Sequence, residues 1–143
     1  NSDKGSITGL YTVLVDGDDM NEPVADTVRG ILDGHIVLSR QMANRNHYPA
    51  IDVLASVSRL MSDIASGDHL KAAGFVKSRM ATYRDAQDLI SIGAYKPGTN
   101  PDIDEAVRLM PAINQLLTQQ VKESFGFEET IQLLQQISHR ETK

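Results

Sequence analysis

The chain has 143 residues, a hydrophobic content of 41% and a formal net charge of -5 at pH 7. This length suits one ordinary domain or two small ones, and the acidic balance argues against nucleic acid as a partner, which would require a basic face. Cysteine is absent, which excludes disulfides and thiolate metal sites. No apolar stretch reaches the ~18 residues of a membrane span and no signal-peptide pattern opens the chain, so we expect a soluble protein.

Residues 6–15 are rich in β-branched and aromatic types, which predicts a strand. A turn-rich acidic loop follows the strand. Clustered oxygens of this kind can hold calcium or magnesium, but the spacing does not continue through the glycine and terminal glutamate of an EF-hand, so a solvated acidic loop is the expectation and no metal site is assigned. The acidic residues of this loop are Asp16, Asp18, Asp19 and Glu22.

The next segments alternate between helix and strand. Pro23 suits the first turn of a helix, and apolar residues recur at helical spacing, which predicts a helix over 23–33 that ends before Gly34. The short apolar run 35–38 predicts a second, buried strand, and 39–46 is expected to form a short helix. This βαβα order is typical of a nucleotide-binding α/β sheet.

Two candidate functional residues lie within residues 48–61, where the strand-rich part gives way to a helical part. Pro49 restricts Tyr48 to an extended conformation, so its ring should project from a rigid turn and offer a flat aromatic face. Arg59 follows the Ser-Val-Ser run 56–58, whose small hydroxyls could orient a guanidinium without crowding it. A tyrosine before proline is most often a packing residue and an arginine after serine a surface charge, so both alternatives stay open at this point.

The rest of the chain is predicted to be helical. Apolar residues spaced by threes and fours indicate a long amphipathic helix over 69–92, and the glycines and prolines of 93–101 indicate a loop. Another helix should begin at Asp102, and Pro111 should kink it or start a new helix. A last helix is predicted over 127–137.

Other titratable residues are expected to have packing or surface roles. The histidines show no metal-ligand spacing, and the paired carboxylates should lie on a solvated helix face without acid/base function. The histidines are His35, His47, His69 and His139. The carboxylates are Asp85 and Asp88, and then Asp102, Asp104 and Glu105.

Two long stretches resemble the flagellar and type III secretion export ATPases, which are relatives of the rotary ATPase catalytic subunits. They are GSITGLYTVLVDGDDMNEPVADTVRGILDGHIVLSR at 5–40 and YPAIDVLASVSRLM at 48–61. The phrase LISIGAYKPG at 89–98 also looks like the export branch. The resemblance covers nearly the whole chain.

This resemblance implies the C-terminal portion of a longer ATPase. Residues 1–62 would be the last strands of a RecA-like P-loop domain, and 63–143 a helical bundle domain, giving an α/β plus all-α fold. No GxxxxGK[ST] motif occurs in the chain. ATP and Mg²⁺ would therefore be bound mainly by residues outside it, and the chain alone should be inactive.

The resemblance also implies roles for single residues. Arg59 resembles the arginine finger that acts on a neighbouring subunit, and Tyr48 with Pro49 resembles the adenine-stacking site. Asp18, Asp19 and Asn21 match a loop that faces the central stalk of rotary ATPases. Residues 93–105 match the position of an acidic stalk-contacting helix-loop-helix but lack its acidic motif.

The implied function is ATP hydrolysis in a homo-hexamer that energises protein export. The implied partners are a stalk-like coiled-coil protein, an ATPase regulator, and export chaperones and substrates. The implied location is cytoplasmic, at the cytoplasmic face of the export apparatus, with only peripheral membrane contact. The alternatives are a rotary ATP synthase catalytic-type subunit and a non-catalytic module that docks partners.

Overall fold

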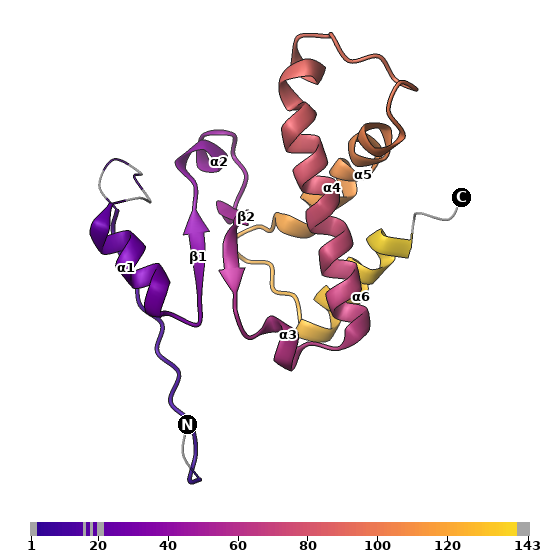
Figure 1. Cartoon of the computed structure of the whole chain (residues 1–143). Helices are drawn as coiled ribbons and strands as arrows, with labels where there is room; N and C mark the ends of the chain where they lie inside the picture. Colours follow the sequence, from indigo (N-terminus) through magenta and orange to yellow (C-terminus); the bar gives the residue numbers. More distant parts are fainter. Residues whose placement is uncertain (1–2, 16, 18, 20–21, 140–143) are drawn as a thin grey trace. The chain divides into compact units, whose positions relative to one another are not determined.

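The structure, a computed structural model, describes residues 3–15, 17, 19 and 22–139 (Figure 1). It is a mixed α/β structure with a small sheet. The chain divides into two compact units, residues 1–33 and residues 34–143. Within the described ranges, no helix combines the length and apolar content that a membrane span requires.

The first unit contains helix α1 (Pro23–Ile31). Pro23 occupies its first turn, where a missing backbone N–H costs nothing, and Ala25 is buried. The Arg29 guanidinium pairs with the Asp26 carboxylate one turn earlier, at 3.0 Å between Nη2 and Oδ1. The helix predicted over 23–33 is confirmed.

The strand predicted over residues 6–15 is wrong for this structure. The segment forms no strand, and its apolar side chains point into solvent: Ile7 is 99% exposed and Leu14 is 94% exposed. A strand is stable only when a neighbour takes up its backbone hydrogen bonds and covers one face. Among the described residues, the assigned sheet consists of β1 and β2, and residues 6–15 are not part of it.

The second unit begins with a two-stranded antiparallel sheet of β1 (Gly34–Leu38) and β2 (Ile51–Ser58), which lie side by side in Figure 1. Helix α2 (Arg40–Asn44) connects them, and the Ser39 hydroxyl caps it by accepting from the Met42 N–H at 3.3 Å. The strand predicted over 35–38 and the helix over 39–46 are confirmed. The sequence patterns had not predicted β2 as a strand.

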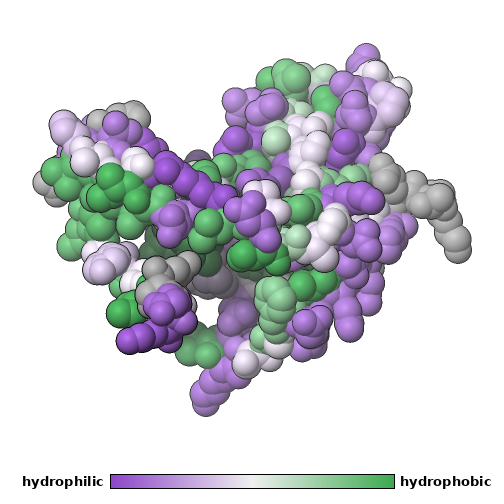
Figure 2. Space-filling model, turned by 60° about the horizontal axis from the view of Figure 1, so that its bottom comes forward, coloured by the Kyte–Doolittle hydropathy of each residue, from purple (hydrophilic) through white to green (hydrophobic). Residues whose placement is uncertain are grey.

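Strand β1 is not the buried strand that its apolar run indicated. Ile36 is 70% exposed and Leu38 is 71% exposed. In the part of the chain that the structure describes, β1 has one partner strand, and an apolar sequence alone does not bury its side chains. Figure 2 shows hydrophobic residues (green) at the surface between hydrophilic ones (purple), in keeping with the many large apolar side chains that stay exposed.

Four helices follow the sheet within the described residues. They are α3 (Met61–Ile64), α4 (Gly67–Ser91), α5 (Pro101–Leu117) and α6 (Phe127–Ser138). Helices α5 and α6 both pack on α4 (Figure 1), which confirms the helices predicted over 69–92 and 127–137. Their shared core consists of Val76, Leu109, Ile113 and Ile137.

Helix α5 continues through Pro111. A new helix does not begin there, although a proline removes one backbone donor and crowds the preceding turn. Leu109 and Ile113, on either side of Pro111, are both almost completely buried in the same core. Their packing holds the two parts of α5 together as one helix.

Candidate functional site

Tyr48 lies in the turn that leads from α2 into β2. Asn46 has a φ of 59°, a left-handed conformation that asparagine tolerates, and the Tyr48–Pro49 peptide bond is cis. The Ala50 carbonyl accepts from the Ser39 N–H at 2.8 Å, which fixes the turn to the residue before α2. The Tyr48 side chain is 52% exposed, so its ring is available to a flat ligand.

The backbone of Tyr48 is held by a distant part of the chain. The Gln119 N–H, in the segment between α5 and α6, donates to the Tyr48 carbonyl at 2.9 Å. Two residues further on, the Val121 side chain is completely exposed. Sequence reasoning missed this neighbour of the tyrosine, because residues 71 positions apart carry no local signal of their contact.

Arg59 directly follows the last residue of β2 and is exposed. The Ser56 hydroxyl, which was expected to help orient the guanidinium, is used elsewhere. It donates to the Asp52 carbonyl at 2.6 Å and accepts from the Val37 N–H at 3.0 Å. Backbone groups of the sheet thus engage the Ser56 hydroxyl, and the orienting role of the Ser-Val-Ser run stays a prediction.

Tyr48 and Arg59 lie at opposite ends of the sheet. Leu38 pairs with Ile51 and Gly34 pairs with Ser58, so the paired region spans roughly 13 Å at ~3.3 Å per residue. Tyr48 precedes this region and Arg59 follows it. The structure therefore does not bring the two candidate residues together at one point.

The acidic loop falls mostly outside the described residues. Asp16, Asp18 and Asn21 lie there, and Asp19 is exposed. Among the residues that the structure describes, no group of three or more histidine, aspartate or glutamate side chains is placed to hold a metal ion.

Two of the histidines have packing contacts. The His35 Nε2 lies 3.2 Å from the Ala55 carbonyl, which links β1 to β2. The His69 ring meets the Phe127 ring edge-on, with 6.2 Å between ring centroids, and joins α4 to α6. Both contacts fit the structural roles that the sequence predicted.

The solvated face predicted for the α5 carboxylates holds for Asp102, whose side chain is 74% exposed, but not for Glu105, which is 21% exposed and faces α4. The Arg79 Nη1 contacts Glu105 Oε2 at 2.8 Å and Asp102 Oδ1 at 3.1 Å. The guanidinium also lies 5.4 Å from the centre of the Phe75 ring. With its side chain only 16% exposed, Arg79 ties the two helices together, a role that sequence reasoning missed.

The loop between α4 and α5 is closed by its own polar groups. The Tyr95 hydroxyl donates to Asp104 Oδ1 at 2.8 Å, and the Gly98 N–H donates to Asp104 Oδ2 at 2.8 Å. Asn100 caps α5 by accepting from the Asp102 N–H. Partial burial, and then the hydrogen bond to Asp104, raise the pKa of Tyr95 above its ordinary value of 10.0. The polar groups of Tyr95, Gly98 and Asp104 therefore stabilise the conformation of this loop.

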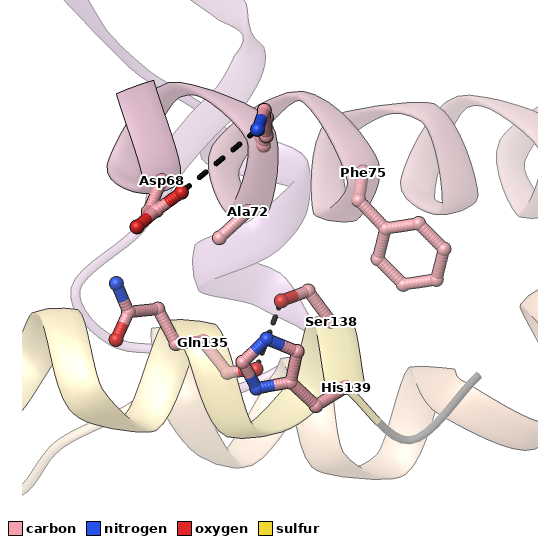
Figure 3. A pocket seen from close by; sticks show the side chains of 7 residues that line it. Asp68, Ala72, Phe75, Gln135, Ser138 and His139 are labelled. Carbon is pink, nitrogen blue, oxygen red and sulfur yellow. Dashed lines mark hydrogen bonds and ion pairs between the residues drawn. The ribbon is translucent and has the colours of Figure 1, made fainter. Parts of the chain in front are cut away.

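A groove of about 520 Å³ lies between α4 and α6 (Figure 3). Two contacts lie among the residues drawn there: Lys71 pairs with Asp68 at 3.9 Å, and the Ser138 hydroxyl donates to the Gln135 carbonyl at 2.8 Å. Neither Tyr48 nor Arg59 lines it. The candidate site is thus the pair of sheet ends that carry these two residues.

Residues 1–58, which include Tyr48 and lead up to Arg59, match the nucleotide-binding domain of the ATP synthase alpha/beta family. Residues 65–136, which include the helical core, match the T3SS EscN ATPase C-terminal domain over about half of the chain. The chain therefore belongs to the T3SS EscN ATPase C-terminal domain family, and its resemblance to the flagellar and type III secretion export ATPases is confirmed.

Individual proteins agree with this assignment. The chain is 51% identical over 140 residues to a flagellum-specific ATP synthase of Bacillus subtilis, covering 98% of the chain and 32% of that protein. It is 44% identical to the assembled ATPase EscN of enteropathogenic E. coli, with a TM-score of 0.88 over 93% of the chain and 32% of EscN.

A second structure of EscN was solved with its central stalk EscO. It is 42% identical, with a TM-score of 0.85 over 96% of the chain and 32% of that protein. The chain thus spans about a third of the length of the relatives it matches.

Proposed function

We propose that the chain is the C-terminal part of a protein-export ATPase of the flagellar or type III secretion class. The longer protein would hydrolyse ATP in a hexameric ring and use the energy to drive export, at the cytoplasmic face of the export apparatus. The family membership and the relatives named for flagellar and secretion ATPases support this proposal. By itself, this chain has no P-loop and should not hydrolyse ATP.

In this proposal residues 1–62 complete a RecA-like nucleotide-binding domain and 63–143 form the C-terminal helical domain. The separate matches of 1–58 and 65–136 to two domain families support this division. The packing of α4, α5 and α6 around one core supports the helical part as a domain of its own.

Tyr48 would stack on the adenine of ATP, with Pro49 shaping its turn. The half-exposed ring fits this role, because stacking requires a flat face open to the ligand. The segment at Gln119, which is hydrogen-bonded to the Tyr48 carbonyl, would border the same pocket. Mg²⁺ and the phosphates would be held mainly by residues outside this chain.

Arg59 would act on the nucleotide of the neighbouring subunit. Charge developing on the γ-phosphoryl oxygens must be met by a donor that stays protonated, and the planar guanidinium provides such a fork. The observation that carries this role is the position of Arg59, exposed beyond β2 and at the opposite end of the sheet from Tyr48. One nucleotide would have to span the sheet to touch both residues, whereas two nucleotides in adjacent subunits meet one end each.

The proposed partners follow the same relatives. One EscN structure holds the central stalk EscO, which supports a coiled-coil stalk protein as a partner of the ring proposed here. The acidic loop with Asp18, Asp19 and Asn21 is the proposed stalk-facing segment. An ATPase regulator and export chaperones with their substrates are the other proposed partners.

A mixed-ring experiment tests the proposed mechanism. Full-length Arg59→Ala should lose roughly 10³ to 10⁵ in turnover, and Arg59→Lys should not restore it, because a point charge cannot reproduce the fork. Mixing Arg59→Ala subunits with subunits that lack the P-loop lysine should recover part of the activity, since some intact P-loops then face intact arginines. Rings that form and exchange subunits but stay inactive would show that Arg59 does not act across the interface.

A further inference from the structure

The two strands of the sheet pair in two different registers. The part of β2 next to Tyr48 pairs with β1 in one register, and the part next to Arg59 pairs with β1 in the other. The paired positions are Leu38 with Ile51 and Val37 with Asp52, then His35 with Val57 and Gly34 with Ser58. Between them, residues 53–56 of β2 lie opposite Ile36 alone. This is an irregular β-bulge with more than one extra residue on β2, and a bulge bends a strand and redirects its side chains.

Side-chain hydrogen bonds close this bulge from within. The Asp52 Oδ1 accepts from the Leu54 N–H and from the Ala55 N–H, both at 3.0 Å. The Ser56 hydroxyl donates to the Asp52 carbonyl at 2.6 Å and accepts from the Val37 N–H at 3.0 Å. Asp52 and Ser56 therefore satisfy backbone groups that the missing ladder leaves open, and they fix the path of the strand.

Beyond the bulge, β2 is pressed closely against β1. A Cβ atom at Gly34 would lie 2.6 Å from the Val57 carbonyl oxygen and 3.2 Å from the Ser58 Cα. Only a residue without a side chain permits this approach, because both contacts are to backbone atoms. Val57 and Ser58 are the two paired residues between the bulge and Arg59. The position of the Arg59 backbone therefore depends on the bulge before these residues and on Gly34 opposite Ser58.

We propose that Asp52 and Gly34 are positioning residues for Arg59, and that the bulge they define sets where the guanidinium reaches the neighbouring nucleotide. This inference rests on the proposed function of Arg59. A transition-state donor is effective only at the correct place, and a misplacement of about 1 Å can cost on the order of 100-fold in rate. A residue that holds the strand just before Arg59 should therefore affect turnover without touching the substrate.

The first test uses Asp52 in the full-length protein. Asp52→Ala removes the acceptor of two backbone N–H groups, and kcat should fall roughly 10- to 100-fold while KM for ATP stays within about twofold. Asp52→Asn keeps an acceptor oxygen and should retain most of the activity. If Asp52→Asn is as defective as Asp52→Ala, the charge of the carboxylate matters rather than the closed bulge, and the inference is wrong.

The second test uses Gly34. Gly34→Ala should displace Val57 and Ser58 and lower kcat in the same way, with ring assembly and ATP affinity preserved. Gly74→Ala is the matched control, because a Cβ at Gly74 in α4 meets nothing within 4 Å. Equal kcat for the two variants would overturn the role of Gly34.

Mixed rings separate this inference from the proposed function. Asp52→Ala subunits should regain activity when mixed with subunits lacking the P-loop lysine, but not when mixed with Arg59→Ala subunits, since both then lack a working arginine. If Arg59→Ala itself stays active, the proposed function fails. If Arg59→Ala is inactive and recovers with the P-loop variant while Asp52→Ala does not, Asp52 serves its own subunit, and only the positioning role fails.

Discussion

Helices α4–α6 and the β1–β2 sheet belong to one unit, yet they differ in how far their apolar side chains are buried. The helices bury Leu109 and Ile113 almost completely in a shared core, whereas the sheet leaves Ile36 and Leu38 about 70% exposed. The candidate site residues Tyr48 and Arg59 lie at the ends of the sheet. The helices, which share a core, thus support stability. The sheet, which carries the residues of the proposed chemistry, contributes none of the residues of that core.

Expressing the two parts separately tests most directly whether the helices fold without the sheet. Residues 63–143 expressed alone should unfold cooperatively, because α4, α5 and α6 pack on one another, while residues 1–62 alone should not. Circular dichroism during heating measures this, and adding ATP should leave the midpoint of 63–143 unchanged. A helical half without a cooperative transition would mean that its core depends on the sheet.

Within the helical part, burial should decide the cost of a substitution. Leu109→Ala removes a side chain that is 1% exposed and should lower the free energy of unfolding by about 2 to 5 kcal/mol. Leu89→Ala makes the same change on α4 at a position that is 50% exposed, and it should cost far less. Chemical denaturation of both variants compares them. Equal costs would contradict the core assigned here.

On the sheet side, a substitution should change binding rather than stability. Tyr48→Ala in the full-length protein should weaken ATP binding by on the order of 1 to 3 kcal/mol, the scale of base stacking, while Tyr48→Phe keeps the flat ring and the affinity. Nucleotide titration of the three proteins tests this. Equal affinity for the wild type and Tyr48→Ala would show that the ring is a packing residue.

The helices could be predicted from the sequence because their signals are local. The periodicity over 69–92 and the breakers over 93–101 placed α4 and the following loop within a few residues of their observed ends. The strands were harder, since a strand requires a partner that the local pattern does not name. Residues 6–15 have strand-like composition but form no strand in the described part of the chain, and their large apolar side chains are mostly exposed.

The candidate site was predicted as separate residues, Tyr48 with Pro49 and Arg59, without their arrangement. Tyr48 and Arg59 were identified by resemblance, but the bulge that connects them depends on side-chain bonds from Asp52 and Ser56, which break the alternation of a regular strand. The contacts of Gln119 with Tyr48, and of Arg79 with Glu105, join residues far apart in the sequence. Such pairings follow from tertiary packing and leave no periodic signal.

The smallest expected effect concerns the loop between α4 and α5, which the hydrogen bond from Tyr95 to Asp104 helps to stabilise. Partial burial of the Tyr95 phenol, and then its hydrogen bond to Asp104, raise its pKa above 10.0. Because the folded pKa lies above the unfolded one, this contact stabilises the loop fully below pH ~10 and is lost as the pH rises through the folded pKa.

Alkaline titration by ultraviolet absorbance tests this contact. The chain has four tyrosines, so the difference between the wild type and Tyr95→Phe isolates the titration of this one phenol. Asp104→Asn should move its pKa downward, because the negative carboxylate no longer opposes ionisation of the ring. A Tyr95 pKa that is unchanged by Asp104→Asn would show that Asp104 does not control the loop, and that the helical part depends on its apolar core even at its surface.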